Sequence, residues 1–469
     1  MTAAAGSPRL NAILGLLLLL TTACAGLREW GASGGALRMT VCILVVVVFL
    51  LMLPGARRGQ KIFAAVAVLM TVAAVAVSPD WSTIVGDSLA TTGFLLAFFS
   101  TITSLGVPAR ASLAILEAGR FLAQQPAGRR YLALTIGGQL FSVFLNYGSI
   151  VLLGNMAVAT AEEEADERIR AIRKKRMLLA IQRAMISTMS WSPLSFAVIF
   201  TLLMIPEADW SHILVPGLVT GTLLAMTGWA LDTLFKPRPF GTPRPAAPVK
   251  ESWLSLWPLL ALLLVLAALL FGVKAATGVR IPGVIIVVAP TLALAWLALQ
   301  TRRPGRLRAV AARAALFVRS DLPRMRSELL VLMLAGYVGA VGGQLVLPFV
   351  EGLGFHAAGV PAALFLMIMV WAPPLAGQLG VHPLLAASLL FPLLPTPTEL
   401  GVSAPALANA ALAGWCLSSA STPFTATVVL IGSYAGATAN EVARKWNGPY
   451  ALACGAILSV WVLLYSAMF

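Results

Sequence analysis

The chain has 469 residues, of which 59% are hydrophobic and 11% are charged, and its mean hydropathy is +0.89. A water-soluble domain needs a wetted surface rich in charged residues, so this composition excludes one and indicates a membrane protein. The net charge of +15 does not indicate nucleic-acid binding, because the basic residues lie in short stretches between apolar runs, where cytoplasmic loops carry them.

The first four apolar runs are each long enough to cross a bilayer core of roughly 30 Å as a helix. They lie at about residues 10–26, 39–54, 62–78 and 86–106. Basic residues follow the second and fourth runs, so we place those loops and the N-terminus in the cytoplasm. The first run also loosely imitates a secretory signal, but we expect a transmembrane helix because further spans follow.

The next apolar run, residues 131–159, has basic residues on both sides. The segment after it, Glu162 to Arg183, holds seven lysines and arginines, and we expect it to lie in the cytoplasm. One span cannot return the chain to the same side, whereas a re-entrant hairpin can. We therefore predict a hairpin with its tip near Asn146 to Ser149. The following segment should begin as a helix at the capping-box pattern Thr160 to Glu163.

Further apolar runs complete a chain of about ten spans and two hairpins. We expect spans at 184–205, 213–235, 253–273, 281–299, 329–349, 405–434 and 450–469, and a second hairpin at 361–395. This topology leaves four of the 33 basic residues outside the cytoplasm, namely Arg28, Arg38, Lys274 and Arg280. The predicted fold class is an all-α polytopic membrane protein of the inverted-repeat transporter type.

One cytoplasmic segment, Thr301 to Arg326, has the pattern of a helix lying on the membrane. Leu307, Val310, Ala314 and Phe317 line one of its faces, while arginines lie off that face.

An internal repeat relates the two halves of the chain. Ser187 to Ser195 and Leu417 to Thr425 align without a gap at an offset of 230, which places Pro193 over Pro423. The charge topology gives the two copies opposite orientations, which is typical of secondary transporters. The expected domains are scaffold helices at 1–83, a first repeat at 84–235, a cytoplasmic linker at 236–250, scaffold and interfacial helices at 251–326, and a second repeat at 327–469.

The repeated motif predicts two discontinuous helices. A proline inside a helix removes a backbone hydrogen bond, so each helix should break near Pro193 or Pro423. We expect Ser192 and Thr422 to be N-caps, so that two half-helices direct unpaired N–H groups toward an anion. The predicted substrate-binding residues are Asn146, Gly148, Ser149, Ser190, Ser192, Pro193, Ser195, Ser419, Ser421, Thr422, Pro423 and Thr425.

Coupling to an ion has fewer candidate residues. His382, at the expected tip of the second hairpin, is a candidate for proton coupling, and Gln378 and Thr427 are candidates for ion coupling. Hydroxyl and carbonyl oxygens suit Na⁺, so Na⁺ is a candidate coupling ion beside H⁺, and we expect no other cofactor and no metal site. No carboxylate falls in the middle of a predicted span, which disfavours a proton relay through a buried acid.

The hairpin with its asparagine, followed by a broken helix rich in serine and threonine, resembles the ion transporter superfamily, which includes divalent-anion/sodium symporters, arsenite permeases and related sodium/proton antiporters. The tip Asn146 to Ser149 only approximates the motif of that superfamily, and the tip near Gln378 to His382 has no asparagine. The resemblance implies an elevator mechanism and a homodimer.

The leading hypothesis is a secondary transporter of a small anion in the inner membrane, coupled to Na⁺ or H⁺, with no catalytic residues. Efflux of a metalloid oxyanion is the alternative transport function. A membrane-embedded enzyme acting on lipids would show clustered acids or histidines, whereas this chain has three scattered histidines. A non-transporting assembly protein is the remaining alternative.

Overall fold

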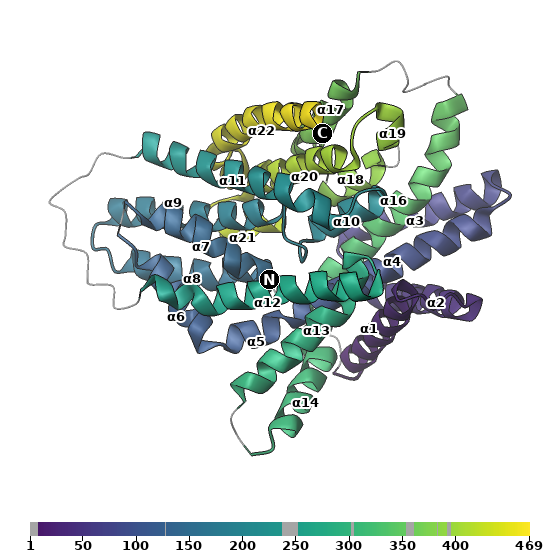
Figure 1. The fold of residues 1–469 in the computed structure, drawn as a ribbon, viewed down its shortest axis with the longest axis horizontal. Helices are drawn as coiled ribbons and strands as arrows, with labels where there is room; N and C mark the ends of the chain where they lie inside the picture. Colours follow the sequence, from purple (N-terminus) through teal and green to yellow (C-terminus); the bar gives the residue numbers. More distant parts are fainter. Residues whose placement is uncertain are drawn as a thin grey trace. The chain divides into compact units, whose positions relative to one another are not determined.

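The computed structural model describes residues 8–126, 128–236, 252–301, 304–352, 361–381, 383–391 and 395–469. Every regular element in these ranges is helical (Figure 1). Among the described residues, ten helical segments are long and apolar enough to cross a membrane. The predicted class of polytopic helical membrane protein is thereby confirmed. Residues 237–250 of the expected linker, and His382, lie outside the described residues.

The chain divides into two compact units. Unit 1 consists of Met1–Pro108, Ala268–His356 and Ala387–Leu394. Its helices are α1 (Pro8–Glu29), α2 (Gly35–Met52), η1 (Leu53–Gly55), α3 (Arg58–Val77), α4 (Trp81–Ser104), α13 (Ile281–Gln300), α14 (Arg306–Leu316), η3 (Phe317–Asp321), α15 (Leu322–Arg324) and α16 (Arg326–Gly352).

Helix α4 lies at the centre of unit 1, where α1, α2, α13 and α16 all pack against it. Its large side chains are buried, with Phe94 5% and Phe98 0% exposed. A small residue permits the close approach of α2, since a Cβ atom at Gly93 would lie 2.5 Å from a methyl group of Val41. By contrast, the outer helices keep apolar side chains exposed, as a lipid environment allows.

Unit 2 consists of Ala109–Ala267, Ala357–Ala386 and Pro395–Phe469. Its helices are α6 (Leu113–Ala123), α7 (Arg130–Leu145), α8 (Gly148–Glu162), α9 (Glu167–Thr188), α10 (Phe196–Met204), α11 (Trp210–Leu234), η2 (Trp253–Leu256), α17 (Ala362–Gln378), α19 (Pro397–Leu400), α20 (Ala404–Ser421), α21 (Ala426–Ala435), η6 (Glu441–Trp446) and α22 (Gly448–Met468). The chain passes between the units within α5 (Gly106–Ala111), α12 (Trp257–Thr277) and α18 (Pro383–Leu390).

Two helical pairs organise unit 2. Helices α7 and α8 form a helix–turn–helix that packs against α9, and α17 packs along α20 (Figure 1). Glycines allow these close contacts: a Cβ atom at Gly138 would lie 2.8 Å from the Cβ of Ala184, and one at Gly414 would lie 2.1 Å from the carbonyl oxygen of Met369.

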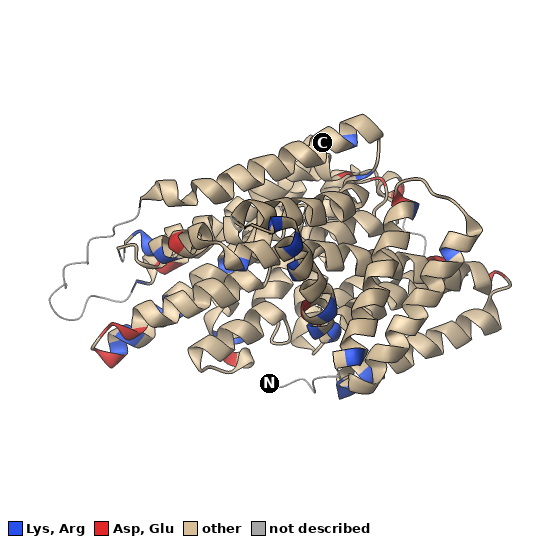
Figure 2. Ribbon diagram, turned by 90° about the horizontal axis from the view of Figure 1, so that it is seen from below, with Lys and Arg blue, Asp and Glu red and all other residues tan. Residues whose placement is uncertain are grey.

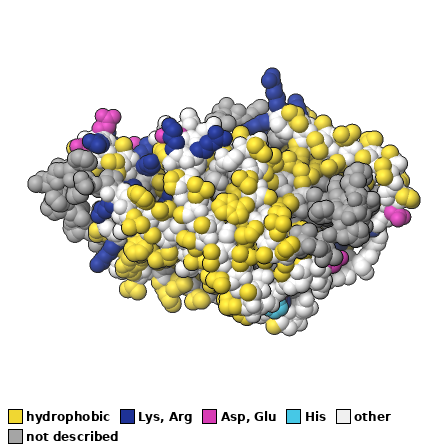
Figure 3. All heavy atoms as spheres, turned by 90° about the horizontal axis from the view of Figure 1, so that it is seen from above, with side chains coloured by type: hydrophobic (Ala, Val, Ile, Leu, Met, Phe, Trp, Pro, Cys, Tyr) yellow, Lys and Arg dark blue, Asp and Glu magenta, His cyan; other side chains and the backbone are white. Residues whose placement is uncertain are grey.

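Charged residues lie mainly at helix ends and in connections, while long stretches of helix carry none (Figure 2). Hydrophobic side chains cover much of the face seen in Figure 3, and lysine and arginine side chains gather toward its margin. Some charges near helix ends form ion pairs, such as Arg38 with Asp87 at 3.0 Å and Arg280 with Glu29 at 3.2 Å.

One predicted helix start is wrong. The pattern Thr160 to Glu163 falls at the end of α8, and α9 begins later, with Asp166 as its N-cap. The Asp166 carboxylate accepts hydrogen bonds from the backbone N–H groups of Arg168 and Ile169. A carboxylate that accepts two N–H groups is a strong cap, and the apolar pairing of α8 with α9 extends α8 past the threonine.

Candidate functional site at two helix breaks

The first break separates α9 from α10. Helix α9 ends at Thr188, and α10 begins at Phe196. Between them, Pro193 lies in a turn that is closed by a hydrogen bond of 2.9 Å from the backbone N–H of Ser195 to the carbonyl oxygen of Ser192. The proline has no N–H group to continue the helix, so the predicted interruption is present.

The second break separates α20 from α21 and has the same construction. Helix α20 ends at Ser421, and α21 begins at Ala426, with Pro423 in the turn between them. The N–H of Thr425 donates to the carbonyl oxygen of Thr422 at 3.3 Å, which corresponds to the bond from Ser195 to Ser192 at an offset of 230.

The side chains at the two breaks also form matching hydrogen bonds. The Ser195 hydroxyl donates to the carbonyl oxygen of Met189 at 3.1 Å. The Thr425 hydroxyl donates to the carbonyl oxygen of Ser419 at 3.3 Å, again six residues back. Both members of each pair are shifted by 230 positions, so the aligned motifs adopt the same local structure.

The predicted N-caps are wrong by three residues. Ser195 and Thr425, not Ser192 and Thr422, occupy the N-cap positions of α10 and α21. Each proline initiates a turn rather than a helix, because the turn hydrogen bond from Ser195 or Thr425 is made before helical geometry resumes.

The first N–H groups of both half-helices lack side-chain caps. Neither Ser195 nor Thr425 accepts a hydrogen bond from a backbone N–H of the helix that it precedes, since both hydroxyls donate backwards. The Thr425 hydroxyl accepts from the hydroxyl of Thr427, at 3.2 Å. The N-terminus of an α-helix carries a partial positive charge, and its first four N–H groups have no partner within the helix. These two termini can therefore bind an anion through their backbone.

The turn between α7 and α8 lies where the sequence predicts the first hairpin tip. Asn146 is the one non-glycine residue of the described chain with positive φ, at 50°. Its side-chain oxygen accepts from the N–H of Tyr147 at 2.8 Å, and its carbonyl oxygen accepts from the hydroxyl of Ser149 at 2.7 Å. Gly148 begins α8. Asparagine tolerates this left-handed region because its short side chain bonds locally.

The Ser192 hydroxyl accepts from the N–H of Leu194 at 3.3 Å, and the Thr422 hydroxyl bonds to the hydroxyl of Ser418 at 3.0 Å. Three other predicted hydroxyls donate to backbone carbonyls. Ser190 bonds to Ser187 and Gly217, at 2.9 and 2.8 Å. Ser421 bonds to Leu417 at 2.8 Å, and Thr427 bonds to Ser419 at 2.6 Å. The Ser419 carbonyl oxygen thus accepts from both Thr427 and Thr425, which holds the second break in its bent form.

Gln378 connects the end of α17 to the second break. Its amide donates to the carbonyl oxygen of Ser421 at 2.7 Å, and its side-chain oxygen accepts from Arg444 at 3.1 Å. The neighbouring Gly377 has no room for a side chain, since a Cβ atom there would lie 2.0 Å from the Thr422 hydroxyl oxygen. The sequence places Gln378 at a tip, whereas the structure shows it bonded to the break.

The two breaks belong to one packed core. Helix α10 packs against α20, and α21 packs against α9. Aromatic rings fill the first of these contacts, with the ring centroid of Trp415 5.5 Å from that of Phe200 and 6.0 Å from that of Phe196. Each half-helix beyond a break therefore packs on the broken helix of the other repeat.

Arg183 is a candidate that the sequence analysis misses. Arg183 is 4% exposed and is the one buried charged residue in the described part of the chain. It contacts the Tyr131 hydroxyl, and its guanidinium carbon lies 4.2 Å from the Tyr450 ring centroid. No carboxylate of the described residues pairs with it, and Asp232 pairs with Arg176 at 2.6 Å. The spacing of seven residues from Arg176 is the signal that places both on one face of α9.

Buried amides near this arginine also escape the sequence patterns. The Asn447 amide donates to Gln182 at 2.9 Å, and Thr220 donates to Asn409 at 2.8 Å. One side-chain atom of each amide, Gln182, Asn409 and Asn447, has no hydrogen-bond partner. No sequence pattern marks these residues, and tertiary packing brings them into the interior of unit 2.

The fold and the paired breaks define a polytopic helical membrane protein built around two broken helices. No model of a known protein family matches the chain, and no curated protein sequence matches it. Solved structures do match, and two of them are membrane transport proteins.

The YdaH transporter of Alcanivorax borkumensis is 15% identical, with a TM-score of 0.49, over 87% of this chain and 99% of that one. MtrF of Neisseria gonorrhoeae, described as illuminating a class of antimetabolite efflux pumps, is 12% identical, with a TM-score of 0.51, over 86% of this chain and 95% of that one. The likeness to MtrF shows the fold.

Proposed function

We propose that this protein is a secondary active transporter of a small anionic solute, which binds between the two helix breaks. The observation that carries the proposal is the pair of matched breaks in unit 2, each of which leaves the first N–H groups of a half-helix without a side-chain cap. Two positive helix ends in one core favour an anion over a neutral or cationic solute.

The buried Arg183 supports the same sign of charge. A buried guanidinium without a carboxylate partner leaves the interior of unit 2 with a positive charge, which a bound anion would balance. Within the proposal, the solute lies closest to Asn146, Ser192, Ser195, Thr422 and Thr425, and Arg183 acts at longer range.

The proposed mechanism is an elevator with inverted repeats. Helices α7 to α10 and α17 to α21 would form the two repeats, with each helical hairpin re-entering the membrane. The breaks, α7, α8 and α17 all belong to unit 2, while α1 to α4 belong to unit 1. This division supports movement of unit 2 with its solute past unit 1, as in the ion transporter superfamily that the sequence resembles. The proposal includes a homodimer in the inner membrane with a cytoplasmic N-terminus.

Na⁺ or H⁺ is the proposed coupling ion. The carbonyl oxygens of Ser419 and Thr422, with the hydroxyls of Thr425 and Thr427, form a set of hard oxygen atoms of the kind that Na⁺ prefers. No group of three histidine, cysteine or acidic side chains suited to a metal occurs among the described residues. Na⁺ coupling through oxygens of the break is therefore the version to test first.

The decisive experiment is transport by the purified protein in proteoliposomes. Uptake of labelled sulfate, phosphate and dicarboxylates is measured with and without a Na⁺ gradient, together with thermal stability in the same anions. The combined variant Ser192→Ala and Thr422→Ala should lose the response to the transported anion. The matched control, Thr222→Ala with Ser433→Ala, removes two exposed hydroxyls of unit 2 that also bond to helix carbonyls. Equal loss in both double variants would refute the assignment of the breaks.

Export of a metalloid oxyanion is the second candidate function. The fold likeness to MtrF, which belongs to a class of efflux pumps, favours testing outward transport. Arsenite and antimonite are therefore included in the panel, with the gradient in both directions. Resistance of cells that express the protein, without uptake of any other anion, would select this function.

A further inference from the structure

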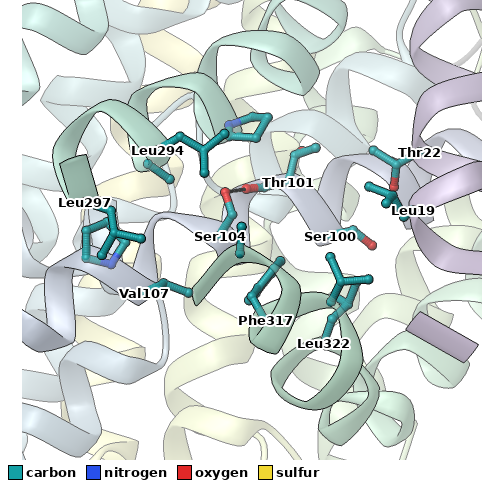
Figure 4. Close-up of a pocket in the computed structure, with 15 residues that line it drawn as sticks. Leu19, Thr22, Ser100, Thr101, Ser104, Val107, Leu294, Leu297, Phe317 and Leu322 are labelled. Atoms are coloured by element: carbon teal, nitrogen blue, oxygen red, sulfur yellow. Dashed lines mark hydrogen bonds between the residues drawn. The ribbon is translucent and has the colours of Figure 1, made fainter. Parts of the chain in front are cut away.

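A cavity of about 190 Å³ lies inside unit 1, the unit that does not contain the breaks. Figure 4 shows side chains from α1, α4, α13 and the η3 segment around it, including Leu19, Ser100, Leu294 and Phe317. Its volume equals roughly six water molecules at about 30 Å³ each. Its walls are almost entirely apolar, so an apolar ligand fits it better than water does.

One wall residue lacks a hydrogen-bond partner. The hydroxyls of Thr22, Thr101 and Ser104 each donate to a carbonyl oxygen of their own helix, at 2.8, 2.8 and 2.6 Å. The Ser100 hydroxyl, 5% exposed, has no partner. A buried hydroxyl without a partner is destabilising, so a ligand that offers an acceptor to Ser100 gains an interaction that the apolar walls do not supply.

The helices α14 and η3 form one wall of the cavity and also carry exposed arginines. Ala314, Phe317 and Val318 line the cavity, and the next residue, Arg319, is exposed. The η3 segment is a π-helical turn, and it approaches α1 so closely that a Cβ atom at Gly15 would lie 1.8 Å from the carbonyl oxygen of Val318. The cavity thus lies directly behind an arginine-bearing segment.

Three arginines of this segment have no acidic partner in the described part of the chain. Arg313 and Arg324 both pair with Asp321, at 2.7 and 3.7 Å. Arg306, Arg308 and Arg319 are exposed and form no ion pair there. A row of exposed arginines beside a membrane helix attracts anionic lipid head groups.

We infer that this cavity binds one acyl chain of an anionic phospholipid, whose head group lies at the segment that carries the exposed arginines Arg306, Arg308 and Arg319. The apolar walls contact the chain, the Ser100 hydroxyl donates to an ester carbonyl oxygen, and the arginines attract the negative charge of the head group. Charge complementarity favours the anionic lipid over a zwitterionic one, and the apolar walls favour an acyl chain as the occupant of the cavity. The inference does not depend on the transported solute.

Native mass spectrometry of the detergent-purified full chain tests this inference. Phosphatidylglycerol and phosphatidylcholine with identical chains are titrated, and lipid that remains bound after activation is counted. We expect one phosphatidylglycerol bound roughly tenfold or more tightly than phosphatidylcholine, because each arginine near the phosphate contributes about 1 kcal/mol. Equal retention of the two lipids by the wild-type protein would overturn the inference, as would equal retention of a free fatty acid.

Two variants separate the head-group contacts from the chain contacts. Arg306→Gln with Arg308→Gln and Arg319→Gln should abolish the preference for phosphatidylglycerol, whereas the control Arg9→Gln with Arg58→Gln and Lys61→Gln, which removes three exposed charges elsewhere in unit 1, should preserve it.

Ala293→Phe fills the cavity and should remove both lipids, with Ala295→Phe as its control, since Ala295 is exposed on the same helix and does not line the cavity. If Ala293→Phe does not fold, the smaller change Ala293→Leu should weaken binding of both lipids severalfold. Unchanged binding in a folded cavity variant would exclude the cavity as the chain site.

Discussion

The thiol of Cys416 donates to the carbonyl oxygen of Ile186 at 3.4 Å, and the two residues are separated by 230 positions. The same separation relates Pro193 to Pro423 and Ser195 to Thr425. Two positions that the alignment makes equivalent are therefore in direct contact. Helix α20 meets α9 at corresponding points, seven residues before the proline of each break.

This equivalence predicts equal effects of two substitutions. Ser195→Ala and Thr425→Ala each remove a hydroxyl that donates to a carbonyl oxygen six residues earlier. We expect each to lower the free energy of unfolding by about 1 kcal/mol, the usual net contribution of one hydrogen bond. Chemical denaturation in detergent measures it. The exposed control Ser433→Ala should change stability by less, and a marked difference between the two site variants would contradict equivalent roles.

The close approach of α17 to the second break predicts that Gly377→Ala is destabilising. The added methyl group would lie 2.0 Å from the Thr422 hydroxyl oxygen, so α17 or the break must move. We expect a loss of about 1–3 kcal/mol, as for overpacked cores, and a fall in transport.

Thermal unfolding and uptake measure these two effects of Gly377→Ala. Thr422→Gly in the Gly377→Ala background should restore part of the stability, because it removes the atoms that clash. Gly272→Ala in α12 is the control, since a Cβ atom there meets nothing within 4 Å, and it should be neutral or slightly stabilising.

We expect the charge of Arg183 to affect anion binding, and this effect can be separated from the effect of its packing. Arg183→Gln should weaken anion binding roughly tenfold or more, because a buried positive charge is lost where dielectric screening is weak. Arg183→Lys should retain part of the affinity. Tyr131→Phe removes a hydrogen bond to the guanidinium and keeps the charge, so it should affect stability more than affinity. Isothermal titration with the transported anion distinguishes these outcomes, and unchanged affinity in Arg183→Gln would remove the arginine from the proposal.

The ion pair between Arg176 and Asp232 predicts a measurable coupling between α9 and α11. The guanidinium donates to both carboxylate oxygens, at 2.8 and 2.6 Å, and the Asp232 side chain is 9% exposed. Asp232→Asn and Arg176→Gln should each be destabilising, and together less so than the sum, with a coupling of about 1–2 kcal/mol. Additive single effects in the double-mutant cycle would show that the pair contributes only local packing.

The positions of the breaks could be predicted because proline acts locally. Pro193 and Pro423 cannot donate a backbone hydrogen bond, and each follows a stretch rich in serine and threonine. By contrast, Pro216, Pro290 and Pro373 lie in apolar stretches and remain inside the helices α11, α13 and α17. The turn at Asn146 is similar, since the short side chain of an asparagine permits the positive φ by its own local hydrogen bond. Composition likewise predicts the helical membrane class. In a bilayer the backbone N–H and C=O groups of a long apolar segment must bond within the protein, and a helix bonds them within the segment itself.

Only the tertiary structure shows which residues form the contacts at these features. The N-caps are Ser195 and Thr425 instead of the predicted Ser192 and Thr422. The hydroxyls of Ser195 and Thr425 bond to carbonyl oxygens six residues earlier, which sequence spacing does not reveal. Arg183 reads as the last residue of a cytoplasmic run, yet packing against Tyr131 and Tyr450 buries it. A residue's chemistry is local, but its burial and its partners depend on helices that lie far apart along the chain.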